Sequence, residues 1–145
     1  MKTKLTLLLC AALCTPMLAA SPDEQAILTT VQHLLDALGK HDKDLLRQQL
    51  LPGGMATLIR NGQPVQLHFD AFADRLGGTQ RIEERIHDPL VKIDDDLAIV
   101  WAPYDFILEG KEDHCGTDLF TLAKRDGRWL ISGLADNSRR DCAAK

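Results

Sequence analysis

The sequence lacks the short motifs that identify the common metal, nucleotide and hydrolase sites. It has no H-E-x-x-H, no other histidine pair at i, i+4 spacing, and no paired C-x-x-C that would bind zinc. The acids Asp94, Asp95 and Asp96 are not followed by the glycine and distal glutamate of an EF-hand. A G-x-S-x-G elbow and a Gly-rich phosphate loop are also missing. We therefore expect no metal and no cofactor.

An excess of positive charge is also absent. The formal net charge is −4, and it becomes more negative if residues 1–20 are removed, because they contain Lys2 and Lys4 and no acid. A moderately acidic surface argues against nucleic acid or an anionic membrane as the main partner. No segment after residue 20 is apolar enough to cross a membrane.

Residues 1–20 have the order of a secretory signal peptide. Lys2 and Lys4 precede an apolar stretch over 5–13, and small residues follow up to Ala20. The stretch is shorter than the roughly 20 residues that a membrane-spanning helix needs. Neither cysteine in this segment follows the small residue of a lipoprotein cleavage site. We expect cleavage near Ala20, a secreted or periplasmic location, and a single mature domain over 21–145.

Two cysteines, Cys115 and Cys142, remain after this processing. In an oxidising compartment two cysteines in a small domain predict a disulfide. If Asp126-Gly127 forms a two-residue turn, Cys115 lies opposite a residue near Ser138. The tail after Ser138 then has to turn back only a short distance to bring Cys142 to Cys115. The closed loop of roughly 27 residues would contribute about 3 kcal/mol to stability.

Helix signals come first in the mature chain and strand signals later. Ser21, Pro22 and Glu24 form a capping box that starts a helix, which Gly39 ends. A shorter helix starts at Asp42 and is closed by Pro52-Gly53-Gly54, a hairpin follows around Asn61-Gly62, and a brief helix covers 71–76. Strands are then predicted over 81–86, 90–93, 97–109, 114–124 and 128–136, with turns at 110–113 and 126–127.

This order predicts an α+β domain in which the helices cover one face of an antiparallel sheet. The last three strands are long, and strands of that length must bend to wrap around something. A strongly curved sheet has a concave face, so the sequence predicts a pocket more clearly than it predicts a reaction.

The last strands also resemble a known family. The residues that carry the resemblance are Trp101-Ala102-Pro103-Tyr104, His114-Cys115-Gly116, Asp118, Phe120, Leu122, Trp129, Ile131, Asp136, Arg139 and Cys142. They resemble the NTF2-like superfamily, and within it the secreted, SnoaL-like proteins grouped as putative lumazine-binding. The resemblance implies a cone, in which a strongly curved antiparallel sheet folds around N-terminal helices and leaves a cavity between them.

The resemblance also implies a homodimer formed through the sheet. A face that the helices leave uncovered would expose Ile99, Trp101 and Ile107, so pairing there is physically reasonable. It does not imply one activity, because the superfamily contains isomerases, dehydratases, cyclases and proteins that only bind or dimerise.

Polar residues lie among the apolar ones on the predicted sheet. A turn at 126–127 places His114 and Asp118 on the same face as Phe120. Tyr104 shares a face with Ala102, whereas Trp101 alternates to the other, and whether Tyr104 meets Asp118 depends on a register that the preceding turn does not determine. Our candidate ligand-binding residues are Trp101, Tyr104, His114, Asp118 and Phe120.

Three interpretations of these residues follow. The first, which we favour, is an exported domain that binds a small, mostly apolar ligand or acts as an accessory module. The alternative is an acid–base enzyme of the isomerase or dehydratase type, with Tyr104 as donor, Asp118 as base and His114 as proton shuttle. In a purely structural account, His114 and Asp118 lie near the rim and bond neighbouring strands or Arg139, and no cavity is needed. The sequence leaves open whether any reaction is catalysed.

Overall fold

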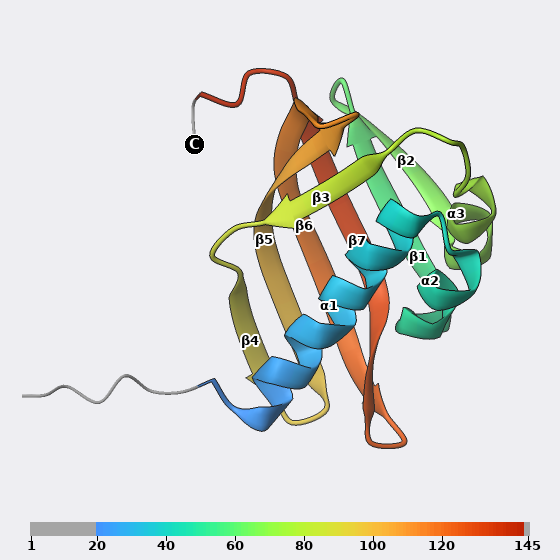
Figure 1. Cartoon of the computed structure of the whole chain (residues 1–145). Coiled ribbons are helices and arrows are strands. Elements are labelled where there is room, and N and C mark those ends of the chain that lie inside the picture. The colour runs from blue at the N-terminus through green and yellow to red at the C-terminus, as the bar shows by residue number, and fades with distance from the viewer. Residues whose placement is uncertain (1–19, 144–145) are drawn as a thin grey trace, which may run out of the picture.

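The computed structural model describes residues 20–143, and the expected signal peptide lies outside these residues except for Ala20. Helices cover one face of a seven-stranded curved sheet, which confirms the α+β class (Figure 1). No helix in the described part of the chain is long and apolar enough to span a bilayer. The elements are α1 (Pro22–Lys40), α2 (Lys43–Gln49), β1 (Leu50–Arg60), β2 (Gln63–His68), α3 (Phe69–Arg75), β3 (Ile82–Ile86), β4 (Leu90–Asp94), β5 (Leu97–Leu108), β6 (Lys111–Arg125) and β7 (Arg128–Arg139).

Helix α1 begins as the capping box predicts and packs along the concave face of the sheet. The Ser21 hydroxyl accepts a hydrogen bond from the Glu24 backbone N–H at 3.1 Å. The Trp129 indole N–H donates to Asp23 at 2.9 Å, which holds the start of the helix against the β6–β7 hairpin. Gly39 does not end the helix. It remains inside α1, where an added Cβ would lie 3.2 Å from the carbonyl oxygen of Ile82, so the missing side chain lets β3 approach.

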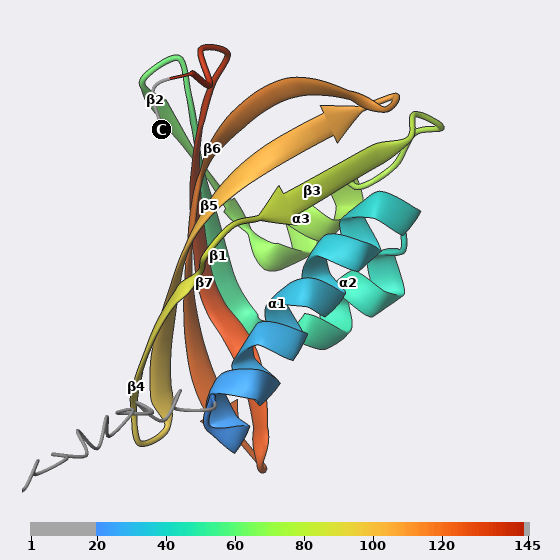
Figure 2. The same cartoon turned by 60° about the vertical axis from the view of Figure 1, so that its left-hand side comes forward.

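The sheet bends strongly over the helices. Its strand order is β2-β1-β7-β6-β5-β3, with β4 pairing with the other half of β5. Figure 2 shows β3 and the adjoining ends of β5 and β6 curving over α1. The pairing of β1 with β7 is parallel, which the predicted antiparallel sheet did not include. Parallel neighbours need a long crossover connection, and here most of the domain separates the two strands.

The hairpin turns follow the sequence signals with one shift. The predicted turn at 110–113 is instead a two-residue turn at Glu109-Gly110, so β6 already starts at Lys111. Both turn residues have positive φ, as a type I′ turn requires, and glutamate is a weak signal for that conformation. The Asn61-Gly62 and Asp126-Gly127 turns have positive φ at both positions too.

Pro52-Gly53-Gly54 does not close α2, because β1 begins at Leu50 and contains all three residues. The register of β1 against β7 shifts between Leu50 and Met55, so this segment forms an irregularity within the strand. Gly53 has φ +86°, and a Cβ at Gly54 would collide with the ring of Phe69. These glycines therefore serve a bulge and a close packing contact.

The convex face of the sheet carries exposed apolar side chains. Leu90 of β4 pairs with Trp101 of β5, and Ile99 and Leu97 alternate onto the same face. We call Leu90, Leu97, Ile99 and Trp101 the convex strip; all four are exposed, Trp101 at 48%. Ile107, predicted to be exposed as well, is buried at 8%. The register of β5 against β6 shifts between Phe106 and Ile107, and the extra residue, Asp113, lies in β6.

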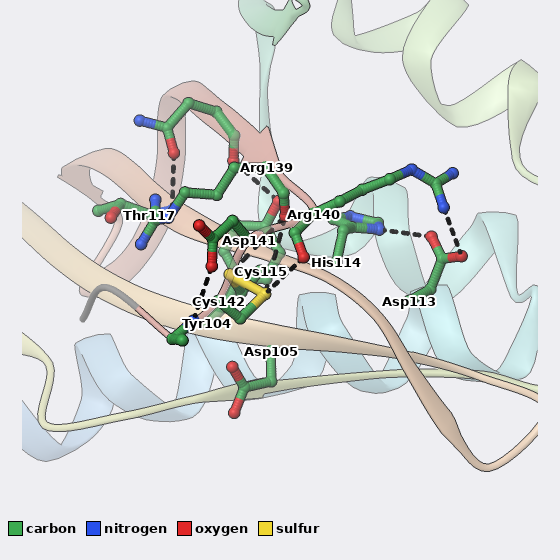
Figure 3. The surroundings of a disulfide bond; sticks show 12 residues. Tyr104, Asp105, Asp113, His114, Cys115, Thr117, Arg139, Arg140, Asp141 and Cys142 are labelled. Atoms are coloured by element: carbon green, nitrogen blue, oxygen red, sulfur yellow. Dashed lines mark hydrogen bonds and ion pairs between the residues drawn. A yellow bond between two sulfur atoms is a disulfide. The ribbon is translucent and has the colours of Figure 1, made fainter.

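The predicted disulfide between Cys115 and Cys142 is present, and Figure 3 shows its surroundings. It joins β6 to the tail that follows β7, because Cys115 lies opposite Arg139 in the β6–β7 register. The bond therefore fixes the residues between the end of β7 and Cys142 against the sheet.

We expect reduction of this disulfide to lower the free energy of unfolding by about 3 kcal/mol, because the bond closes a loop with a sequence separation of 27. Urea unfolding of the mature chain with and without a phosphine reductant measures the difference. The double variant Cys115→Ala/Cys142→Ala is the control and should not respond to reductant. Equal midpoints for the oxidised and reduced wild-type chain would contradict the expectation.

Candidate functional site

A cavity of about 150 Å³ lies between the concave face of the sheet and the helices. We call it the inner cavity. Leu34 and Leu38 of α1 and Phe72 of α3 cover it, while the sheet supplies the other walls. Its lining consists of seven apolar side chains and four charged ones: Leu34, Leu38, Leu58, Phe72, Phe106, Phe120 and Leu134, with Arg60, Glu84, Asp118 and Asp136.

The strand register brings two of the acids together. Asp118 of β6 lies directly opposite Asp136 of β7 and, on its other side, opposite Ala102 of β5. The small Ala102 leaves space beside Asp118. Glu84 reaches the same cavity from β3, where it lies opposite Phe106. Three carboxyl groups from three strands therefore face one mostly apolar volume.

Arg60 neutralises one of these acids. Its guanidinium donates two hydrogen bonds to Asp136, at 2.6 and 2.7 Å, and the Asp136 side chain is only 12% exposed. This bidentate geometry is the strongest form of an arginine–carboxylate pair. Arg139, which the structural interpretation of the sequence offered as a partner for Asp118, lines a different cleft.

Glu84 and Asp118 share a proton. Asp118 is 3% exposed, and no N–H or O–H donor within residues 20–143 reaches its buried Oδ2 atom. Its carboxyl group is hydrogen-bonded to that of Glu84, and two acids form such a bond only when one of them is protonated. Burial raises the pKa of both groups, and repulsion from Glu84 and Asp136 raises the pKa of Asp118 further. Asp118 therefore holds the proton and donates to Glu84.

Tyr104 lies beside the inner cavity without lining it. Its side chain is fully buried, and its hydroxyl donates a 2.9 Å hydrogen bond to the Asn137 carbonyl oxygen. Burial raises the pKa of Tyr104 above its usual range, so the hydroxyl remains a donor. Gly116 lies opposite Tyr104, and a Cβ there would collide with the ring and with the Asn137 carbonyl. The register thus places Tyr104 diagonally from Asp118, on the same face.

The other candidate residues are distributed over three places. Phe120 is fully buried and lines the inner cavity together with Asp118. His114 stacks on Phe106 with ring centroids 4.5 Å apart, but its Nδ1 atom is hydrogen-bonded to Asp113 outside the cavity. Trp101 belongs to the convex strip, because it is one residue away from the inward-facing Ala102. Tyr104, His114 and Asp118 therefore do not converge on one cavity.

Sequence reasoning missed Glu84 and Arg60 as site residues. A signal for Glu84 exists in the period of β3, where it lies between Ile82 and Ile86 at alternate positions, so an acid occupies an otherwise apolar stripe. Arg60 had no comparable signal, since its role depends on the parallel pairing of β1 with β7. Asp136 was noted only among the residues that carry the family resemblance, and the observed register places it opposite Asp118.

The family model described as "putative lumazine-binding" matches residues 22–133. The chain belongs to this family. The match covers all three helices and all seven strands except the end of β7. No curated protein sequence matches the chain.

Solved structures show that this member of the putative lumazine-binding family has an NTF2-like fold. An NTF2-like protein from Cytophaga hutchinsonii superposes with a TM-score of 0.71 at 16% identity, covering 82% of this chain and 100% of that chain. An NTF2-like protein of unknown function from Shewanella baltica has a TM-score of 0.65 at 15% identity, covering 81% and 94%. A putative scytalone dehydratase from Novosphingobium aromaticivorans has a TM-score of 0.68 at 15% identity, covering 81% and 84%.

We expect Asp118→Asn to stabilise the protein increasingly as the pH rises. The raised pKa of Asp118 means that the folded chain holds a proton that the unfolded chain loses near pH 4, so the contribution of Asp118 to wild-type stability falls as the pH rises from about 4. The asparagine amide donates to Glu84 without this proton. Between about pH 5 and about pH 8, the advantage of the variant in free energy of unfolding should grow by at least about 1 kcal/mol.

Denaturant unfolding at each pH measures this advantage. Asp126→Asn is the matched control, because it removes the same charge from an exposed turn residue. An advantage of Asp118→Asn that does not grow with pH in this range, or a control that behaves like Asp118→Asn, would argue against the shared proton.

Proposed function

We propose that this protein binds a small, mostly apolar molecule of about the size of one ring in the inner cavity. The observation that supports the proposal is the combination of seven apolar walls with a proton-sharing carboxyl pair in a volume of about 150 Å³. Apolar cavities of roughly this size accept benzene, whereas sites for larger ligands span roughly 300–1,000 Å³.

The carboxyl pair suggests the polar edge of the ligand. Protonated Asp118 is a donor and ionised Glu84 an acceptor, so together they complement an adjacent carbonyl and N–H, as in an amide or lactam. A ligand with this edge would replace the bond between the two acids by one bond to each. The family description names lumazine, and the cavity supports a ring-sized ligand without selecting among heterocycles.

A second candidate function is acid–base catalysis of the isomerase or dehydratase type. It is favoured by the pKa of Glu84, which burial raises to about 7, so that this group can both take and release a proton near neutral pH. Among the sequence candidates Asp118 remains in this role, while Tyr104 and His114 are hydrogen-bonded elsewhere. The similar fold of a putative scytalone dehydratase agrees with this class. Recovery of the bound molecule chemically changed would distinguish catalysis from binding.

We also infer that the protein is exported and works in an oxidising compartment. The signal-peptide pattern of residues 1–20 and the Cys115–Cys142 disulfide support this inference from two independent parts of the chain.

A homodimer through the convex strip is our proposal for the assembly. Neighbouring exposed apolar side chains on one face of a sheet are typical of protein interfaces, and a two-fold axis would place each strip against its copy.

For the ligand proposal, we expect benzamide to bind the mature chain with a dissociation constant of about 1 mM or below. Leu58→Trp should abolish binding, because Leu58 lines the inner cavity and the larger ring fills it. Saturation-transfer NMR measures binding, and circular dichroism confirms that the variant is folded. Leu97→Trp at an exposed position on the convex face is the control and should bind like the wild type. Unchanged binding by Leu58→Trp, or none by the wild type, would refute a ring-sized site here.

For the assembly proposal, we expect Trp101→Glu to convert the dimer to a monomer, since it places a charge in the centre of the convex strip. Sedimentation velocity at several concentrations measures the oligomeric state. Val65→Glu makes the same change at another exposed apolar residue and should remain dimeric. A wild-type chain that is monomeric at all concentrations would rule out the dimer.

A further inference from the structure

The inner cavity contains more acidic than basic groups. Its lining has three carboxyl groups, those of Glu84, Asp118 and Asp136, and one guanidinium, that of Arg60. No other arginine, lysine or histidine from the described residues 20–143 is part of this lining. Because Glu84 and Asp118 share one proton, one negative charge remains in excess. The charge balance of the cavity therefore favours a ligand that carries a positive charge.

Arg60 has no free donor for an anionic ligand. Its two Nη atoms donate to Asp136 at 2.6 and 2.7 Å, and one of them also donates to the Ile59 carbonyl oxygen at 3.1 Å. An anion at this place would have to displace Asp136 and leave its nearly buried carboxylate without a partner. The net charge of the chain, −4, also attracts cations and repels anions. The single cation of the cavity thus serves the protein itself.

One oxygen atom in the cavity wall lacks a hydrogen bond. Asp118 is 3% exposed and lines the cavity, and its Oδ2 atom has no partner within residues 20–143. Buried polar atoms without a partner are rare in folded proteins. The side chains that cover the cavity from the helices, Leu34, Leu38 and Phe72, are apolar and have no donor to offer. A donor for this oxygen therefore has to come from a ligand.

The shared proton occupies the place that a cation would take. Glu84 of β3 and Asp136 of β7 repel an ionised Asp118, while Arg60 of β1 partly offsets the repulsion. From β5, Tyr104 contributes only a neutral hydroxyl, which is bonded to the Asn137 carbonyl oxygen. In the free protein, one proton relieves the repulsion between the two acids. A cation between them relieves it in the same way, so Asp118 can release its proton to the solvent.

Resting on the proposed function, we propose that the inner cavity binds a flat organic cation with two adjacent N–H donors, such as an amidinium or a protonated amino-heterocycle. Its ring contacts the apolar walls, one N–H donates to Asp118, and the other donates to Glu84. Both contacts are charge-assisted hydrogen bonds, which are roughly twice as strong as neutral ones. A neutral amide fits the same two acids while they keep their proton, so the two kinds of ligand differ in charge rather than in shape.

The test compares benzamidine, which is positively charged at pH 8, with benzamide, which has nearly the same shape and no charge. At pH 8 Glu84 is ionised, because burial raises its pKa only to about 7, and Asp118 holds the proton. We expect the mature, disulfide-bonded chain to bind benzamidine about tenfold more tightly than benzamide, which corresponds to about 1.4 kcal/mol. Binding of benzamidine should release about one proton, and binding of benzamide none. Isothermal titration calorimetry in buffers of different ionisation enthalpy measures affinity and proton release together.

Three variants locate the cation. Asp118→Asn should lose most of the preference for benzamidine and release no proton, because asparagine cannot become a carboxylate. Asp126→Asn is the matched control, since it removes a carboxylate from an exposed turn residue, and it should behave like the wild type. Leu58→Trp fills the inner cavity and should bind neither probe.

Binding of benzamide that is as tight as or tighter than binding of benzamidine would overturn the cationic ligand and leave the ring-sized site standing. Binding of benzamidine without proton release, or by the Leu58→Trp variant, would also overturn it, because the cation would then not replace the shared proton. Failure of both probes to bind the wild type would overturn this inference and the proposed function together.

Discussion

The structure depends on the burial of the apolar face of α1 in the concavity of the sheet. Ile27, Val31 and Leu34 are almost completely buried there, against residues such as Phe120 and Ile131 that point inward from β6 and β7. The sheet bends because its long strands follow the helix, and Gly39 lets β3 close against it. The apolar contact of the helix is complete along its middle. Towards its C-terminal end the walls separate, and the inner cavity occupies that space.

Charged groups in this space oppose folding unless they are compensated. Arg60 compensates Asp136 by two hydrogen bonds, whereas Asp118 and Glu84 reduce their cost by sharing a proton. A purely structural core would gain stability from apolar residues at these positions. That three strands each contribute an acid to the same cavity is therefore an observation that supports the proposed ligand site, since functional sites commonly cost stability.

Much of the fold could be predicted because its signals are local. The capping box at Ser21, the turns at Asn61-Gly62 and Asp126-Gly127, and the disulfide between Cys115 and Cys142 all depend on residues close in sequence or on the register of one hairpin. The candidate site was less predictable, because its geometry depends on pairings between distant strands. The alternation of residues along its own strand was enough to predict that Asp118 faces the pocket. Arg60, in contrast, reaches Asp136 only because β1 pairs in parallel with β7. No sequence signal distinguished the bulge at Pro52-Gly53-Gly54 from the end of a helix. Likewise, none distinguished the register shift beside Ile107 from a regular strand.

The parallel contact of β1 with β7 has a consequence for the synthesis of the chain. Leu58 and Leu134, which both line the inner cavity, belong to paired strands that are separated by most of the chain. Contacts of such long sequence separation form slowly, because a large loop must close before they contribute any free energy. A nascent chain that has not yet emerged as far as β7 therefore contains the helices and the first hairpin but has no closed cavity, so the inner cavity forms only when the final strand joins.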